Sequence, residues 1–389
     1  MDKSYLYNLF NKNIFSDYFL KDVVYKGYPL HMPRAIEIWE MLLNSLLASI
    51  REEFGKVQIV TDLPQTIPTR YLSIFYNDRF NRIEERIPNF TNKQGDKISI
   101  MTDALPYLFS KLEEGDVFFS TYNVVRPRNI GVKPLLRDEF IRYFQFVISS
   151  NNNSLAQNIE KLEKAIRRFF YNVRISTITV DRHSDSYYLK KSCLHATWIN
   201  GNIESVLQCG ILKKQYELKS GETKSVIDVG GAQRLLATFI YNNSDIHGLF
   251  LPHHLRDYDI IIRSEHMNDA LLRFCKYVCN MGCKLKYIPE NVPLNRIKRI
   301  AISASAIAIV VKRTIANHEF LTIYNRDMTV TNLYSNIDIE NWFSKKYNAI
   351  EMFPYVQQTS HIMSRVYQNE LYLRKTKKCY TINSNGLFN

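Results

Sequence analysis

Residues 173–227 consist almost entirely of strand-like segments separated by short polar turns. VRISTITV, SCLHATWI and IESVLQCGIL are rich in β-branched residues, and Asn200-Gly201 stands between the last two. Asn-Gly between two alternating segments is a strong signal for a β-hairpin. A further strand-like segment, SVIDV, runs through Gly230 and Gly231 into the helix-like sequence QRLLATFIY. We therefore expect the chain to be built around an antiparallel sheet flanked by helices.

A long amphipathic helix is predicted upstream of these strands, from residue 34 to 53. Its apolar residues recur at the i, i+3, i+4, i+7 spacing, and Gly55 ends it before a short strand from Val57 to Thr61. The stripe is wider than one small sheet needs, so it predicts a homodimer or a heteromeric contact. The residues that carry this prediction are Trp39, Leu42, Leu43, Leu46 and Leu47.

The segment between this unit and the central strands is less regular. Residues 66–92 show no clean period and are expected to form an irregular connector with a short helix. Ile98 and Ile100 then predict a strand, and a helix is expected to begin near Ala104. The N-terminal half of the chain therefore supplies the strands and helices of an α+β domain.

Composition changes in YNNSDIHGLFLP, residues 241–252, which we interpret as a linker. Strand-like and helix-like segments alternate beyond it, as in an α/β domain. We expect a core domain at 1–248, an α/β domain at 249–345 and a basic tail at 346–389. The tail residues expected to contact nucleic acid are Arg374, Lys375, Lys377 and Lys378.

The charge balance favours a polyanionic partner. The chain has 51 Lys and Arg against 38 Asp and Glu, a formal net charge of +13. Such an excess binds nucleic acid through phosphate neutralisation and counterion release. No apolar segment is long enough to span a bilayer, and the N-terminus lacks the pattern of a secretory signal. We expect a soluble intracellular protein located in the cytoplasm, and import into mitochondria is the alternative.

The cysteines raise the question of a metal site. Cys275, Cys279 and Cys283 recur every fourth residue, which on one continuous helix would align three sulfurs. Structural zinc sites use a different spacing, and no histidine completes the set. We therefore expect reduced thiols that face the core, and no metal.

The sequence VVRPRNIGVKPLLRDEF, residues 124–140, predicts two strands joined by an arginine-rich loop. This hairpin resembles motif 2 of class II aminoacyl-tRNA synthetases, and SVIDVGGAQRLLATFI resembles their motif 3. TDALPYLFSKLEE, from Thr102, resembles the segment that faces the amino acid. The resemblance covers about residues 25–345. It is to the glycyl, threonyl, prolyl and histidyl subgroup, and the glycyl type fits best.

This resemblance implies a class II antiparallel sheet followed by an anticodon-binding-like α/β domain. It places Arg126 on the α-phosphate of ATP, Phe140 against the adenine and Arg234 near the γ-phosphate. Glu204 is the implied magnesium ligand, with Asp228 as a further candidate. Gly230 and Gly231 would allow the backbone to approach the ligand closely.

Several positions depart from the family pattern. Arg128 stands where the family has a glutamate that accepts a hydrogen bond from the adenine amino group. A guanidinium cannot accept a hydrogen bond. Asp62 replaces an expected proline, and one arginine is missing before Glu139. These changes predict a paralogue that has lost aminoacylation and uses no cofactor. A divergent active synthetase using ATP and magnesium is the alternative, and a metabolic or regulatory role is a third.

A relative that has lost its activity would keep the former tRNA surface. We expect its partner to be tRNA, structured RNA or duplex DNA. A protein partner from a polymerase or from the translation machinery would fit the same role. The accessory subunit of mitochondrial DNA polymerase, a glycyl-synthetase-like protein, is an example of this role. The C-terminal segment TIYNRDMTVTNL resembles the corresponding segment of that subunit.

Overall fold

The computed structural model describes residues 20–22, 29–61, 63–70, 89–108, 112–113, 115–125, 135, 138–175, 177–182, 192–199, 202–212, 216–217, 223–245, 247–251, 253–316, 318–346 and 381–384. In several strands only the backbone is described, among them residues 20–22, 178–182, 192–199, 202–205, 216–217 and 381–384. The chain divides into two compact units, with the boundary between Asn242 and Asn243. The linker predicted at residues 241–252 spans this boundary.

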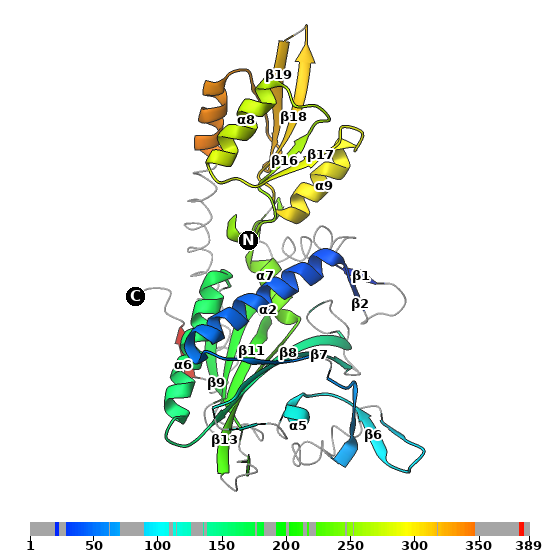
Figure 1. Ribbon diagram of the computed structural model, residues 1–389, viewed down its shortest axis with the longest axis vertical. Helices are drawn as coiled ribbons and strands as arrows, with labels where there is room; N and C mark the ends of the chain where they lie inside the picture. Colours follow the sequence, from blue (N-terminus) through cyan, green and yellow to red (C-terminus); the bar gives the residue numbers. More distant parts are fainter. Residues whose placement is uncertain are drawn as a thin grey trace. The chain divides into compact units, whose positions relative to one another are not determined.

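The first unit is built on a nine-stranded sheet (Figure 1). Strand β3 pairs with β7 in parallel, and the other described pairings are antiparallel. In spatial order the strands are β21 (Thr381–Ser384), β9 (Ile178–Arg182), β10 (Ser192–Ile199), β11 (Asn202–Ile211), β13 (Thr223–Ala232), β8 (Phe140–Ser150), β7 (Val117–Val125) and β3 (Gln58–Val60), with β12 (Tyr216–Glu217) beside β13. The predicted antiparallel sheet is confirmed. Strand β21 comes from the segment predicted as a tail.

Helices α2 (Pro33–Phe54) and α6 (Leu155–Asn172) lie side by side on one face of this sheet, and α7 (Arg234–Asn242) contacts α2 (Figure 1). The ring of Trp39 packs against that of Phe144 on β8, with centroids 5.9 Å apart. Arg168 of α6 forms ion pairs with Glu52 and Glu53 of α2. The apolar face of α2 is thus covered by the sheet and its neighbouring helices.

This packing changes the interpretation of the apolar stripe. All five of its residues are buried within the chain: Trp39, Leu42, Leu43, Leu46 and Leu47. A stripe that is already buried supplies no argument for a partner, because no apolar area is left to cover. Dimerisation therefore stays a prediction without this support.

The opposite face of the sheet carries α5 (Leu105–Leu108) and a small three-stranded sheet. Its strands, in order, are β4 (Thr66–Pro68), β6 (Lys97–Ile100) and β5 (Asn89–Thr91). We expected an irregular connector at 66–92, and this prediction was wrong at both ends of the segment, where strands β4 and β5 lie. Strands β4 and β5 each hold three residues, too few for a visible period, and pairing with β6 stabilises them. A further short hairpin joins β1 (Leu20–Asp22) to β2 (Pro29–His31).

The second unit is the predicted α/β domain. Its five-stranded sheet has the order β17 (Leu285–Ile288), β16 (Ile260–Arg263), β18 (Ala308–Ile315), β19 (His318–Asn325) and β20 (Val330–Leu333). Strand β16 pairs in parallel with β17 and β18, and β18, β19 and β20 pair antiparallel. The short strands β14 (Ser244–Asp245) and β15 (Gly248–Leu249) and the 3-10 helix η3 (His253–Leu255) precede it.

Two helical layers cover the sheet of the second unit. Helix α8 (Asp269–Asn280) and the helix at 336–346 share a core with one face, and α9 (Leu294–Ala304) packs on the other. Asn268 caps α8, since its side chain accepts a hydrogen bond from the Leu271 amide at 2.8 Å. None of the described helices has the length and the low charge that crossing a membrane requires.

The cysteine prediction is partly wrong. Helix α8 ends at Asn280, and Gly282 follows with a φ of 86°, so Cys283 does not continue the helical face of Cys275 and Cys279. Cys275 and Cys283 are buried as expected, whereas Cys279 is exposed.

Candidate functional site

The face of the first sheet that carries α5 brings the predicted motifs together. Gln145 of β8 lies opposite Ser120 of β7 and Gly230 of β13. Two pairs further along, Val147 lies opposite Asp228 of β13. Directly paired residues in an antiparallel sheet point to the same side, so motifs 2 and 3 share this face.

A buried hydrogen-bond network joins three strands on this face. The Tyr122 hydroxyl donates to Gln145 Oε1 at 2.8 Å, and Gln145 Nε2 donates to Asp228 Oδ1 at 2.8 Å. The Ala104 amide donates to the same Gln145 oxygen at 3.2 Å. Gln145 is 1% exposed and Asp228 is 4% exposed, so the bonds form away from water. Such a network fixes the side chains in one arrangement.

The electrostatic environment of Tyr122 reflects this burial. Burial raises the pKa of Tyr122 well above its ordinary value, and the nearby Asp103, Tyr143 and Asp228 raise it further. Tyr122 therefore stays protonated and acts as a hydrogen-bond donor. This is a packing role and offers no general base near neutral pH.

The segment that resembles the amino-acid-facing motif reaches this network. Asp103 Oδ1 accepts from the Leu105 amide at 2.9 Å, which satisfies a free amide at the start of α5. Thr102 is buried, and the side chains of Ala104, Leu105 and Leu108 pack against the sheet beside Tyr122. Thr102 and Asp103 therefore lie on the face that the motif 2 and motif 3 segments share, and their role towards an amino acid stays a prediction.

The two glycines of the motif 3 strand serve the packing of the chain itself. A Cβ atom at Gly230 would lie 2.4 Å from the Tyr143 hydroxyl oxygen. A Cβ atom at Gly231 would lie 2.5 Å from Cζ of Phe144 and 3.0 Å from the backbone oxygen of Val206. The space that we expected a ligand to use above Gly230 holds the Tyr143 side chain.

Two of the residues predicted to hold ATP, Phe140 and Arg234, lie at one end of the sheet. Val125 pairs with Phe140, which is half-buried, and Arg126 follows Val125 but lies outside the described residues, as does Arg128. Arg234 is the first residue of α7, just beyond the end of β13, and is also half-buried. The structure therefore brings Phe140 and the start of α7 to the end at which β7 stops.

Two residues that the sequence did not single out stabilise this end. The side-chain oxygen of Gln233 accepts a hydrogen bond from the backbone amide of Arg142 at 3.0 Å. The backbone amide of Gln233 donates to the Arg142 carbonyl, also at 3.0 Å. Its side-chain amide also donates to Asp138 Oδ2, which accepts from the Leu135 amide at 2.7 Å. The end of the motif 2 hairpin is thus attached to the start of α7. Gln and Asp next to motif residues carry no periodic signal, so sequence reasoning missed them.

The magnesium ion expected for an active enzyme needs a gathered set of oxygen donors. Asp228 is buried and already accepts from Gln145, and Glu204 lies opposite Thr197 in β11 with its side chain outside the described part. Over the described ranges, no three His, Cys, Asp or Glu residues lie close enough to hold an ion. The described residues do not fit a magnesium site.

Four predicted nucleic-acid contacts have no described structure. Arg374, Lys375, Lys377 and Lys378 all lie outside the described residues, and their role stays a prediction.

Comparison with known proteins identifies the fold. No family model matches the sequence, and no curated protein matches it significantly. Prolyl-tRNA synthetase from Giardia lamblia, solved with prolyl-adenylate, matches with a TM-score of 0.69 and 12% identity, over 90% of this chain and 80% of that one. Prolyl-tRNA synthetase from Cryptosporidium parvum, solved with halofuginone and AMPPNP, matches with a TM-score of 0.70 and 13% identity, over 92% and 79%. The same enzyme with L-proline and AMP matches with a TM-score of 0.67 and 13% identity, over 90% and 78%.

The chain therefore has the class II aminoacyl-tRNA synthetase fold with an additional α/β domain, and the predicted fold class is confirmed. The similar structures are of the prolyl type. They support the class II fold and do not support the glycyl type or a polymerase subunit in particular.

Proposed function

We propose that this protein is a nucleic-acid-binding relative of class II aminoacyl-tRNA synthetases that has lost aminoacylation. The observation that carries the proposal is the filled face of the first sheet. Tyr143 covers Gly230, and Tyr122, Gln145 and Asp228 bond to one another in the interior. An adenylate needs this face open, because its charged groups must meet donors of the protein directly.

Substitutions in the motif 2 hairpin support the same proposal. Arg128 replaces the acceptor for the adenine amino group, and over the described ranges no three His, Cys, Asp or Glu residues lie close enough to hold an ion. A site without these groups loses both the recognition of the base and the charge neutralisation that phosphoryl chemistry requires.

Retention of the fold and the net charge of +13 support binding to tRNA or to another structured RNA, with duplex DNA as a further possibility. The cations at 374–378 are proposed to contact phosphates. An accessory role for the translation machinery or for a polymerase, as a homodimer or a heteromer, is part of this proposal. No cofactor is needed for it.

The alternative is a divergent active synthetase. Its support is that Phe140 and the start of α7 lie at the same end of the sheet, which is where the resemblance places ATP. The similar structures were solved with prolyl-adenylate, AMPPNP or AMP. Such an enzyme would use ATP and magnesium to activate an amino acid and would then charge tRNA.

Amino-acid-dependent exchange of pyrophosphate into ATP separates the two functions. We expect no exchange with any amino acid, together with binding to a tRNA pool that weakens steeply as salt rises. Exchange with one amino acid, lost in both Arg126→Ala and Arg234→Ala, would overturn the loss of activity. Absence of exchange together with absence of RNA and DNA binding would overturn the nucleic-acid proposal.

A further inference from the structure

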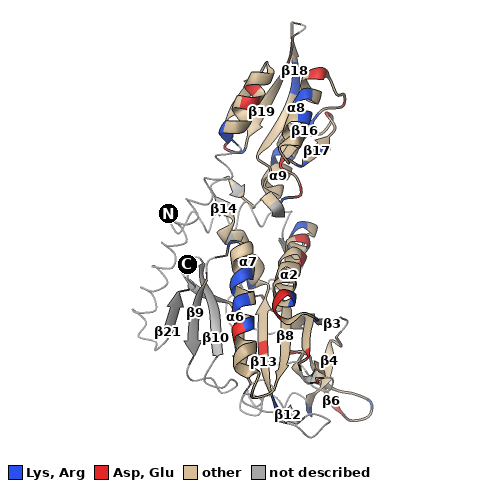
Figure 2. Cartoon of the chain, turned by 60° about the vertical axis from the view of Figure 1, so that its left-hand side comes forward, with Lys and Arg blue, Asp and Glu red and all other residues tan. Residues whose placement is uncertain are grey.

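Strand β20 forms one edge of the five-stranded sheet, and among the described strands only β19 pairs with it. The opposite edge strand, β17, contains Lys286 and is followed by Pro289, and a lysine or a proline at a sheet edge disfavours pairing with a further strand. Residues 328–337, which include β20, contain no charged residue and no proline. Figure 2 marks the charged residues of this unit in blue and red. The sheet therefore has one protected edge and one unprotected edge.

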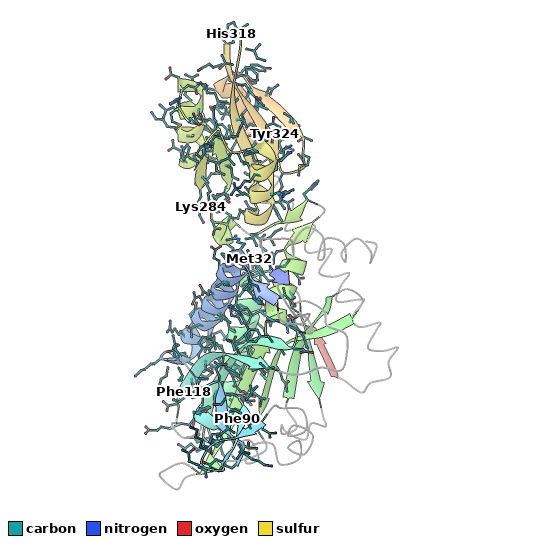
Figure 3. The ribbon with its side chains drawn as sticks, turned by 90° about the vertical axis from the view of Figure 1, so that its right-hand side faces the viewer. Met32, Phe90, Phe118, Lys284, His318 and Tyr324 are labelled. Carbon is teal, nitrogen blue, oxygen red and sulfur yellow. The ribbon has the colours of Figure 1, made fainter. Side chains whose placement is uncertain are left out.

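The hydrogen bonds of the β19–β20 hairpin show which backbone groups face the unprotected edge. The Asn325 amide donates to the Thr329 carbonyl at 2.9 Å, and Figure 3 labels the neighbouring Tyr324, which lies opposite Val330. Hydrogen-bonded and non-hydrogen-bonded pairs alternate along an antiparallel ladder. Every second residue after Thr329 therefore bonds to β19, and the N–H and C=O groups of Val330 and Asn332 point away from β19.

The side chains at this edge form an exposed row on the face that carries α9. Leu333 lies in the core beside α8, so Val330 and Asn332 lie on the opposite face. Tyr334 continues this row and stacks on Phe320, with ring centroids 5.1 Å apart. Val330 is 57% exposed, Tyr334 is 70% exposed, and the exposed Asn332 stands between them. The row thus consists of a polar residue with an apolar or aromatic residue on each side.

Such an edge is complementary to a second copy of itself. In an antiparallel register centred on Asn332, that residue lies opposite the partner's Asn332, and the two exchange a pair of backbone hydrogen bonds. Val330 then lies opposite the partner's Tyr334 on the same face, and the reciprocal contact forms on the other side of the two-fold axis. This register matches polar side chains with polar ones and apolar side chains with apolar ones.

The charge of the chain also favours a second copy as the occupant. With a net charge of +13, two copies repel each other wherever charged surfaces meet. The uncharged segment 328–337 offers a contact without this repulsion. It also presents no charge by which an acidic or a basic protein would be selected.

We propose that β20 is the contact surface of a homodimer, in which two copies pair edge to edge and join their five-stranded sheets into one continuous sheet. Addition of a strand to a free sheet edge is a general mode of association between chains. Burial of Val330 against the partner's Tyr334 supplies the apolar contribution. The proposal specifies a surface for the homodimer that the proposed function allows, and it does not depend on nucleic-acid binding.

Sedimentation equilibrium of the full chain, freed of nucleic acid, tests the surface. We expect the wild type to dimerise reversibly and Val330→Lys to weaken the dimer at least about tenfold, because a lysine on an edge strand opposes pairing. Leu272→Lys is the matched control, since Leu272 is a 41% exposed apolar residue of α8 and the variant adds the same charge away from β20. This control should dimerise like the wild type, and thermal melts check that both variants are folded.

Disulfide formation tests the register. The background is Cys279→Ser, which removes an exposed native thiol. In this background Asn332→Cys should oxidise to a covalent dimer, because directly opposed Cα atoms in a hydrogen-bonded pair are about 5.5 Å apart. Val330→Cys should not, because the two copies of residue 330 lie four positions apart in this register, about 13 Å along the strand.

Three results would overturn the proposal. A wild type that stays monomeric at the highest concentration reached would exclude the dimer. Equal association of Val330→Lys and the wild type would place the contact on another surface. Failure of Asn332→Cys to give more covalent dimer than Val330→Cys would exclude the register. Binding of a tRNA pool is measured separately, so the proposed function stands if the dimer fails and tRNA still binds.

Discussion

Replacing His31 by leucine should make the stability of the protein less sensitive to acid. His31 ends β2, just before α2, and is 7% exposed. Neither of its ring nitrogens has a hydrogen-bond partner among the described residues. Burial, and after it the positive charge of Arg142, lower the pKa of His31 from 6.5 to about 4. The folded chain therefore holds this ring neutral at a pH where the unfolded chain protonates it.

The sign and the size follow from proton linkage. The pKa of His31 is lower in the folded chain than in the unfolded chain. The contribution of His31 to the free energy of unfolding is therefore fully present above about pH 6.5 and is lost as the pH falls from 6.5 towards 4. Each pH unit in this window costs about 1.4 kcal/mol. The loss from this single group is about 2 kcal/mol between pH 7 and pH 5, and about 3 kcal/mol at pH 4.

Urea unfolding followed by tryptophan fluorescence measures this effect at about pH 7 and about pH 5. Other groups also titrate in this range, so the decisive quantity is the change in stability of the wild type minus that of His31→Leu. We expect this difference to be about 2 kcal/mol. His318→Leu, at an exposed histidine of β19, is the control and should behave like the wild type. Parallel pH profiles for the wild type and His31→Leu would refute the reasoning.

Two further predictions concern the interior of the first unit. Gly231→Ala should destabilise the first unit by about 1–3 kcal/mol, because the new Cβ meets both the buried Phe144 ring and the backbone of Val206; a thermal melt equal to that of the wild type would contradict it. Tyr122→Phe should cost about 1 kcal/mol in urea unfolding, because Gln145 Oε1 loses its hydroxyl donor but keeps the Ala104 amide. A loss several times larger would mean that the network depends on Tyr122 alone.

Much of the fold could be predicted from local signals. The helix predicted at 34–53 is α2 at Pro33–Phe54, because its period of 3.6 and the glycine after it act within a few residues. The Asn200-Gly201 signal correctly predicted that the strands on either side of it pair, since β10 and β11 are antiparallel and Ile199 lies opposite Asn202. Such signals need no knowledge of distant residues.

Predictions failed where a distant partner decides the structure. Strands β4 and β5 lie at the two ends of a segment that showed no period, and both exist because β6 pairs with them. Cys283 has the helical spacing of Cys275 but lies beyond the end of α8. The apolar stripe of α2 suggested a missing partner, and the partner was the rest of the same unit.

The sequence alone determined most of the order of the elements, the class II resemblance and the excess of positive charge, and it predicted the loss of the adenine acceptor at Arg128. Each of these depends on residue identity or on short spacing along the chain. Only the tertiary structure decided that Tyr143 fills the space above Gly230 and that Gln145 joins Tyr122 to Asp228, 106 residues further along the chain. Strand register controls such contacts, and register is set by the whole sheet, since a shift of one residue would turn each of these side chains to the other face.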